Sequence, residues 1–363
     1  MEPDAGADKE VSGVMPVEVA LPHRAVNGES LSQSSPRPVS GKIHGARYSL
    51  YLADCLAWMS AQSEACVHAI VTDPPYGLKE YTDQEKAKLR RGRGGVWRLP
   101  PAFDGCQRSP VPRFTILTEE DRNELQTFFI EFATRAFRIL VPGGHLFIAT
   151  NPLLSHLVYV PLINAGFEKR GEIIRLVQTL RGGDRPKNAH EQFPHVSVMP
   201  RSCWEPWGLF RKPCEGRVQD NLRKWKTGGL RRVSVGSPFC DVIESSPTRA
   251  EERAIAPHPS LKPQAFIRQI VRAALPLGEG VVLDPFMGGG STIAAALAVG
   301  YDSVGIEVDP VFFTVAQRAV PRLSRASLNG TWKAPSDDTQ ALLQLFDAPW
   351  EKNGVYATRR ARF

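Results

Sequence analysis

Apolar residues along the chain fall into two alternating patterns, short continuous runs and longer stretches with helical spacing. The run Val67–Thr72 is mostly apolar and stops before two prolines, which is typical of a buried parallel strand. Residues 119–140 instead repeat apolar side chains every three or four positions, as an amphipathic helix does. Near the end of the chain, strand-like residues 280–284 and 302–308 flank an apolar helical stretch at 293–299. Strands that alternate with helices of this size predict an α/β fold with a doubly wound parallel sheet.

Weaker patterns extend this interpretation to the rest of the chain. Residues 47–54 alternate as a short strand does, and residues 145–150 form a further apolar run after the stop signal at 142–144. The other expected elements are a helical patch at 56–59, strands within 168–179 and 196–212, and helices at 151–165, 264–274 and 311–320.

Four segments lack these patterns. Residues 1–42 are rich in proline, serine, glycine and acids, so we expect them to be disordered. Residues 78–118 are polar, basic and rich in glycine and proline, and so long a loop inside a compact domain is usually functional or disordered. Residues 213–256 are polar with little periodicity, and we interpret them as an insert that carries recognition loops. The tail at 326–363 lacks strong periodicity and ends in basic residues.

Positive charge is concentrated in two parts of the chain. The net charge is +7, which suggests a polyanionic partner. Residues 169–232 contain 15 lysines and arginines against 6 acids, and residues 79–113 contain 9 against 4. The two segments together exceed the charge of the whole chain, so the positive charge is localised rather than spread over the surface.

Several classes of protein are disfavoured by what the sequence lacks. Its longest apolar stretches, such as 293–299, are far shorter than the ~20 residues that cross a bilayer, and no secretory signal opens the sequence. The six cysteines are scattered, without the spacing of a zinc site. We therefore expect a soluble, cytoplasmic protein with no membrane partner and no metal.

A short motif, Asp73-Pro74-Pro75-Tyr76, follows the first buried strand. Ligands of open α/β sheets bind at the carboxyl ends of strands. The two prolines stiffen the backbone and lack amide donors, so their carbonyls are left as fixed acceptors beside the carboxylate of Asp73. Tyr76 adds a flat stacking surface. This set suits an exocyclic amino group on a flat base, although a proline-rich turn after a strand is the alternative interpretation.

A glycine-rich turn, residues 284–292, joins a predicted strand to a predicted helix. A phosphate-binding P-loop needs lysine before the serine, where Gly290 stands, and a dinucleotide fingerprint needs glycine at position 293, which is Ile293. An ordinary tight turn does not need three glycines. Glu307 ends the next strand about 20 residues later, where an acid suits ribose hydroxyls. A nucleoside cofactor without a pyrophosphate is favoured.

Together these residues resemble the amino-methyltransferases of DNA, in the circularly permuted group whose catalytic motif precedes the cofactor motif. The match covers roughly residues 44–323 and is supported by further segments at 51–56, 141–144, 204–213 and 258–263. The resemblance implies a Rossmann-like methyltransferase fold with a mostly parallel, seven-stranded sheet. Its catalytic half would lie in 43–212 with the basic loop 78–118, its target-recognition insert in 213–256 and its cofactor-binding half in 257–325.

The resemblance also implies S-adenosylmethionine as the cofactor. Its adenine amino group would lie near Asp54, its ribose hydroxyls would bind Glu307, and its methionine portion would lie beside Asp284. The remaining candidates line the cofactor pocket or bind the cofactor carboxylate: Phe286, Gly288 and Gly290 for the lining, and Lys262, Ser291 and Thr292 for the carboxylate.

The implied reaction is methylation of N6 of adenine. Asp73 and the Pro74 carbonyl would accept the two N–H bonds of the amine, Pro75 would complete the rigid turn, and Tyr76 would stack on a base flipped out of the duplex. The nearest alternative is N4 of cytosine, for which serine more often replaces Asp73. RNA or a protein glutamine is a more distant alternative, and a DNA-binding module with a decayed site is a third.

The resemblance adds expectations about partners. Double-stranded DNA is the expected substrate, with residues 79–113 closing over it and residues 181–187 and 217–232 contacting phosphates and base edges. Core packing explains Trp204 and Trp207 better than base stacking does, and we interpret His258 as a turn residue rather than a base. A homodimer, a restriction endonuclease partner and association with a prokaryotic nucleoid are also expected.

Overall fold

The computed structural model describes residues 38–75, 118–181, 186, 188–198, 200 and 202–328. The chain divides into two units, Met1–Ser34 and Ser35–Phe363, and every described residue lies in the second. The predictions for Tyr76, for nearly all of the basic loop and for the tail beyond residue 328 lie outside the described residues.

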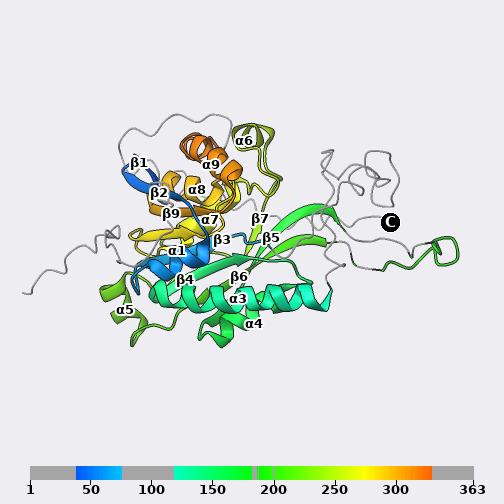
Figure 1. The fold of residues 1–363 in the computed structure, drawn as a ribbon, viewed down its shortest axis with the longest axis horizontal. Helices are drawn as coiled ribbons and strands as arrows, with labels where there is room; N and C mark the ends of the chain where they lie inside the picture. The colour runs from blue at the N-terminus through cyan, green and yellow to red at the C-terminus, as the bar shows by residue number, and fades with distance from the viewer. Residues whose placement is uncertain are drawn as a thin grey trace, which may run out of the picture. The chain divides into compact units, whose positions relative to one another are not determined.

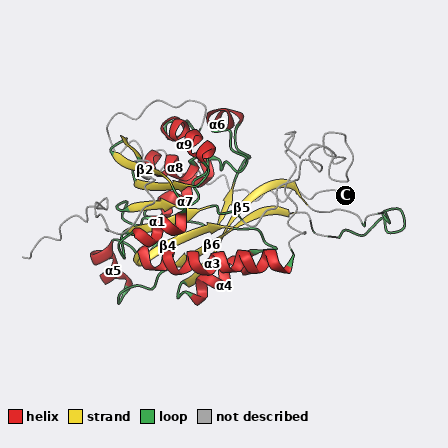
Figure 2. Ribbon diagram, viewed as in Figure 1, coloured by secondary structure: helices red, strands yellow, loops and turns green. Residues whose placement is uncertain are grey.

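One nine-stranded sheet runs through the described part of the chain, in the order β1-β2-β9-β8-β3-β4-β6-β5-β7 (Figures 1 and 2). The five strands from β2 to β4 are mutually parallel, whereas β1 and β6 run antiparallel to their neighbours. The strands are β1 (Val39–Ile43), β2 (Ala46–Leu52), β3 (Val67–Thr72), β4 (Leu140–Ala149), β5 (Glu168–Arg181), β6 (Ser202–Arg211), β7 (Val242–Glu244), β8 (Val281–Asp284) and β9 (Asp302–Glu307).

The sheet confirms the predicted mostly parallel α/β fold and corrects its strand count from seven to nine. One added strand, β1, begins at Val39 and so lies partly inside the segment 1–42 that we expected to be disordered. It pairs with β2 through a two-residue turn, His44–Gly45, whose φ angles are +51° and +84°. Such a turn matches the twist of two antiparallel strands. The other added strand, β7, pairs parallel to β5 at the opposite end of the sheet.

Helices cover both faces of this sheet (Figure 1). They are α1 (Cys55–Ala61), α3 (Glu119–Ile139), α4 (Ser155–Asn164), α5 (Val218–Trp225), α6 (Ala250–Ile255), α7 (Gln264–Ala274), α8 (Ser291–Ala298) and α9 (Pro310–Leu323). Because successive side chains of a strand point to opposite faces, Ile70 packs with the apolar residues of α1, α3 and α4, and Val71 packs with α7 and α8. No helix of the described residues is both long and apolar enough to cross a membrane.

Residues 213–256, which we interpreted as an insert that carries recognition loops, contain more regular structure than loops alone. They contain α5, β7 and α6, and β7 is part of the main sheet. The buried side chain of Asn221 fastens α5 to the beginning of β4, since its Nδ2 donates to the carbonyl of Pro142 at 3.0 Å and also to that of Thr227 at 2.8 Å. Its Oδ1 accepts the amide of Glu215 at 2.8 Å. Little apolar periodicity was visible because this attachment is polar.

Replacing Asn221 by alanine is expected to lower the free energy of unfolding by about 2–4 kcal/mol, because it leaves buried backbone groups without partners. Arg223→Ala on the same helix is the matched control. Its side chain is exposed and pairs with Asp220 at 2.8 Å, so a change within about 0.5 kcal/mol is expected. Thermal unfolding of both variants measures the difference, and equal losses would contradict the docking of α5 through Asn221.

Candidate active site

The two predicted motifs meet at the carboxyl edge of the sheet. β3 and β8 are adjacent and parallel, and the hydroxyl of Thr72 at the end of β3 donates to Asp284 Oδ1 at the end of β8 (2.7 Å). Asp73 follows directly, partly buried, with Pro74 buried and Pro75 exposed beyond it. The catalytic and cofactor candidates, far apart in sequence, therefore lie side by side as the parallel topology requires.

Lys262 lies against Asp73. Its Nζ is 2.6 Å from Asp73 Oδ2 and 3.2 Å from Glu205 Oε1. Burial alone would lower the pKa of this ammonium, but the charges of Asp73 and Glu205 outweigh burial and raise the pKa above its ordinary value. Lys262 is therefore cationic and forms ion pairs with two carboxylates. Sequence reasoning assigned it to the cofactor carboxylate and missed Glu205, which stands in β6 between aromatic residues.

The glycine turn is shaped by backbone that other residues adopt with difficulty. Gly288 and Gly290 have φ of +49° and +84°, and Gly290 is the residue before the first turn of α8. A Cβ at Gly288 would come within 2.9 Å of the ring of His258, and one at Gly290 would overlap Val320. The ring of His258 also packs edge-on against Phe312 with centroids 4.4 Å apart, which agrees with a structural role.

Two further acids lie beside this turn on neighbouring strands. Leu52 of β2 pairs with Glu307 of β9, and Asp54 follows as the N-cap of α1, where it accepts the amide of Ala57 at 2.8 Å. Glu307 accepts the amides of Gly288 and Asp309, each at 2.9 Å. The predicted acids of the cofactor site thus end adjacent strands, and Glu307 is bonded to the glycine turn itself.

The rest of the turn packs inward. The half-buried ring of Phe286 lies 5.7 Å from that of Phe132 and 6.0 Å from that of Phe128, both on α3. Ser291 and Thr292 are buried in the first turn of α8, and the Thr292 hydroxyl hydrogen-bonds to Asp284. Thr292 therefore supports the Asp284 carboxyl, a contact that its prediction as a cofactor ligand did not include.

Burial raises the pKa of Asp284 to about 6, against hydrogen bonds from Thr72, Thr292 and the amide of Phe286 that lower it. A carboxyl whose pKa is raised by folding stabilises the protein below its unfolded pKa, and this contribution is lost as the pH rises through the folded value. The wild type is therefore expected to lose stability relative to Asp284→Asn as the pH rises from 4 to 7. The difference in the free energy of unfolding between the two proteins is expected to change by up to about 3 kcal/mol over this range. Thermal unfolding at several pH values measures it, and a difference that does not change with pH would contradict it.

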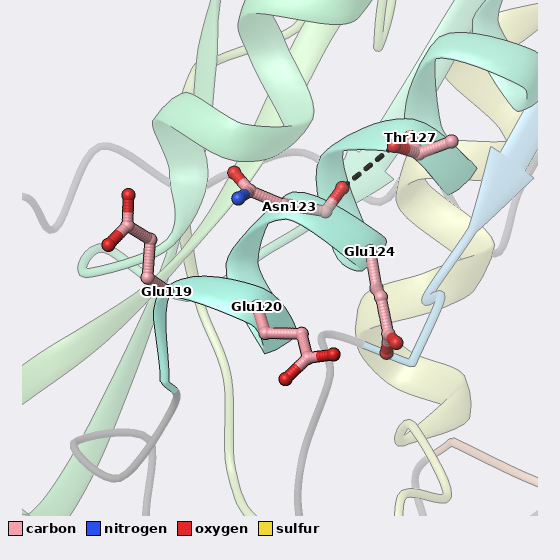
Figure 3. A pocket seen from close by; sticks show the side chains of 5 residues that line it. All are labelled: Glu119, Glu120, Asn123, Glu124 and Thr127. Atoms are coloured by element: carbon pink, nitrogen blue, oxygen red, sulfur yellow. Dashed lines mark hydrogen bonds between the residues drawn. The ribbon is translucent and has the colours of Figure 1, made fainter.

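An open hollow follows the first turns of α3 (Figure 3). It is lined by Glu119, Glu120, Asn123, Glu124 and Thr127. The hydroxyl of Thr127 donates to the Asn123 carbonyl within it (2.8 Å). Its three carboxylates repel phosphates, so it does not suit contact with the DNA backbone.

Residues 217–232 lie at the other edge of the sheet from Asp73. Asn221 binds Pro142 near the beginning of β4, and Arg231 donates to the hydroxyl of Tyr301, the residue before β9, at 2.7 Å. Both anchor points are at the amino ends of parallel strands, whereas Asp73 follows a carboxyl end. The prediction that 217–232 contacts phosphates and base edges of DNA stays a prediction, and any such contact would lie away from the carboxyl ends of the strands. Residues 79–113 and most of 181–187 lie outside the described residues.

A family model for DNA methylases, N6_N4_Mtase, matches residues 67–318, more than two thirds of the chain. The chain belongs to this DNA methylase family. The match runs from the start of β3 to α9, so it includes Asp73, the glycine turn and Glu307. The chain is therefore a DNA methylase, and the residues at the carboxyl edge are the candidates for its active site.

Individual relatives agree with the family. The type II methyltransferase M.HindIII of Haemophilus influenzae is 23% identical over 291 residues, which cover 74% of this chain and 93% of that protein. The type II methyltransferase M2.DpnII of Streptococcus pneumoniae is 28% identical and is covered over 87% of its length, with 73% of this chain. Among solved structures, the cytosine-N4-specific PvuII DNA methyltransferase superposes with a TM-score of 0.50 at 13% identity, over 85% of this chain and 96% of that one. That last likeness shows the shared fold.

Proposed function

We propose that this DNA methylase transfers a methyl group from S-adenosylmethionine to N6 of an adenine flipped out of double-stranded DNA. The observation that carries the proposal is the position of Asp73. It lies at the end of β3, one residue beyond the hydrogen bond that joins Thr72 to Asp284 of the cofactor strand. An acceptor for the amine and a site for the methyl donor are thereby neighbours.

The groups around the glycine turn suit S-adenosylmethionine. Asp54 and Glu307 supply carboxylate acceptors on adjacent strands, which the adenine amino group and the ribose hydroxyls of the cofactor need. The buried carboxyl of Asp284 favours a cation beside it, because a neighbouring positive charge stabilises the carboxylate. When bound, S-adenosylmethionine supplies that cation and an activated methyl group. We assign the lining to Phe286, Gly288 and Gly290.

The cofactor carboxylate needs donors. We assign Ser291 to it and keep Thr292 as a second candidate, although the Thr292 hydroxyl already bonds to Asp284. Lys262 is held by Asp73 and Glu205, so we assign it to the catalytic carboxylate instead of the cofactor.

Asp73 would act by orienting the amine. The lone pair of the adenine amino group is delocalised into the ring, which makes this nitrogen a weak nucleophile. Lys262 binds Oδ2 of Asp73, and we assign Oδ1 and the Pro74 carbonyl to the two N–H bonds. Accepting both N–H bonds directs the lone pair out of the ring, and Asp73 takes the proton late. Positioning in a dry site provides most of the acceleration, with Tyr76 stacked on the flipped base.

The choice of adenine rests on the aspartate. Serine is more frequent at this position in enzymes that methylate N4 of cytosine, and a carboxylate is the stronger acceptor. N4 of cytosine is the alternative, and the likeness to the PvuII enzyme in fold keeps it open. RNA or a protein glutamine is a more distant alternative.

Incubation with labelled S-adenosylmethionine and unmethylated double-stranded DNA, followed by nucleoside analysis, tests the proposal. N6-methyladenine is the expected product. N4-methylcytosine would overturn the choice of base, and label in RNA or protein without label in DNA would overturn the proposal as a whole.

The remaining expectations form part of the same proposal. The catalytic half is residues 43–212, the target-recognition insert is 213–256 and the cofactor half is 257–325, in the permuted order. Both curated relatives are type II methyltransferases, and we extend that class, with a restriction endonuclease partner, to this chain. We also propose a homodimer that acts on the nucleoid in the cytoplasm of a prokaryotic cell.

A further inference from the structure

A chain of four charged side chains in contact extends from the catalytic edge into the protein, and we call it the charge chain. It consists of Asp73, Lys262, Glu205 and Arg175. Lys262 Nζ bridges Asp73 and Glu205 at 2.6 and 3.2 Å, and Arg175 Nη1 donates to the other oxygen of Glu205 at 3.0 Å. Carboxylates and cations alternate, so the four groups together are neutral.

Glu205 is the most firmly held member. It pairs in register with Arg175 across β6 and β5, and its Oε1 accepts the indole N–H of the fully buried Trp207 at 2.9 Å. Arg175 is itself buried, with its guanidinium 5.1 Å from the ring centroid of Phe266 and its Nε donating to Ser245 at 3.0 Å. The inner half of the charge chain is thus fixed by strands and aromatic side chains.

Glu205 is ionised at neutral pH. Burial acts to raise the pKa of Glu205, but the charges of Lys262 and Arg175 and the bond from Trp207 outweigh burial and lower the pKa to about 2. Stability offers little reason to keep such a network, because well-packed apolar residues of similar volume are often as stable as buried ion pairs. A role at the adjacent Asp73 is the better explanation.

We propose that Glu205 is a positioning residue of the methylase, which acts through Lys262 to hold the carboxylate of Asp73 oriented for the target amine. The proposal rests on the function proposed for Asp73. Lys262 alone would place an unshared positive charge on Asp73 and weaken it as an acceptor. Without Lys262, Asp73 and Glu205 would face each other as like charges. Glu205 shares the positive charge of Lys262, and Arg175 compensates the negative charge of Glu205, so both situations are avoided.

Other charged groups face the same place. Asp284 of β8 and His258, which precedes Lys262, both interact electrostatically with Asp73. The charge of Lys262 also acts on His258. The hydrogen bonds and ion pairs of the charge chain itself join Lys262 and Glu205 to Asp73, Arg175 and Trp207. Substitutions at Lys262 and Glu205 therefore change the charge beside Asp73, while Asp284 and His258 are kept.

The test is the pH dependence of methyl transfer in single turnovers, at saturating S-adenosylmethionine and DNA. Lys262→Met is expected to shift the acid limb of the pH–rate profile to higher pH by roughly 1–2 units, because two carboxylates then share the site. Glu205→Gln is expected to lower the plateau rate about tenfold without changing KM, with no upward movement of the limb. The double variant removes one charge of each sign, so its limb is expected to return toward that of the wild type.

Recovery in the double variant separates this role from a merely structural one, in which two substitutions damage the protein at least as much as one. A limb in the double variant that stays where Lys262→Met puts it would overturn the proposal, as would an unmoved limb in Lys262→Met. Lys262→Gln replaces Lys262→Met if thermal unfolding shows that the methionine variant does not fold. Glu168→Gln is the matched control, since Glu168 pairs with Arg211 at 2.6 Å, where β6 lies beside the amino end of β4. It is expected to leave both rate and limb unchanged.

Failure of the proposed function would look different. In that case the wild type would not methylate DNA, or Asp73→Ala would still do so. A different result would overturn only the role of the charge chain. In that result the wild type methylates DNA and Asp73→Ala does not, but the acid limb of the pH–rate profile is the same in the variants of Lys262 and Glu205 as in the wild type.

Discussion

Asp73→Ala is expected to lower the rate of methyl transfer to DNA by about 10²–10⁴-fold while S-adenosylmethionine still binds. The variant loses the acceptor that orients the amine, but none of the groups of the glycine turn. Its Lys262 keeps Glu205 as a partner at 3.2 Å, so no buried cation is left alone. Single-turnover rates measure the chemical step, and calorimetric titration measures binding of the cofactor.

Asp302→Ala is the control for Asp73→Ala. Asp302 begins β9 at the amino edge of the sheet and pairs with the exposed Arg47 at 2.9 Å, so its loss removes an aspartate ion pair far from the reaction. Normal turnover is expected. Retained methyl transfer in Asp73→Ala would refute the assignment of Asp73, and loss of cofactor binding would show that it acts on the cofactor site.

Gly290→Ala is expected to destabilise the protein by about 2–5 kcal/mol and to weaken cofactor binding at least tenfold. The left-handed backbone at Gly290 costs any L-residue about 1–2 kcal/mol. The new methyl group also overlaps Val320, which is fully buried on α9, and overpacking of this kind costs about 1–3 kcal/mol. The strain falls on the start of α8 and hence on the turn that carries Gly288.

Gly300→Ala isolates the contribution of the overlap. Gly300 has φ of +80°, close to the +84° of Gly290, yet a Cβ built there has nothing within 4 Å. It is therefore expected to lose only about 1–2 kcal/mol, with normal affinity for S-adenosylmethionine. Thermal unfolding and titration of the two variants are compared directly. Equal effects would mean that backbone strain, and not packing against α9, fixes the glycine turn.

The parts of the fold with strong local signals were predictable from the sequence. The run from β8 through the glycine turn to α9 was found because apolar strands, a glycine-rich turn and a helix follow each other without a break. β1 was missed, because half of its side chains face solvent and its turn has His44 where asparagine or glycine is usual. α5 was missed because a single buried Asn221, rather than an apolar stripe, fastens it.

The site divides in the same way. Motifs singled out Asp73, Asp284 and Glu307, and the parallel order of the strands then brought them to one edge. Sequence reasoning assigned no site role to Glu205 or Arg175, because Arg175 is one of several charged residues of β5 and their contact arises only when β5 pairs with β6. The count of basic residues at 217–232 likewise did not place this segment in the fold. Charge along a sequence says nothing about the edge of the sheet on which it will lie.

The pairing of β3 with β8 and of β2 with β9 has a consequence for biosynthesis. Leu50 is paired with Gly305, and at a translation rate of about 5–20 residues per second the ribosome needs roughly 10–50 s to make the chain between them. Throughout that time the early strands emerge with open edges, which are prone to aggregate. A nascent chain interrupted before Val281 carries Asp73, the carboxylate that we propose for catalysis, but lacks β8 and the glycine turn. Because its strands lack their pairing partners, we expect such a chain to bind chaperones or to be degraded, and to have no activity of its own.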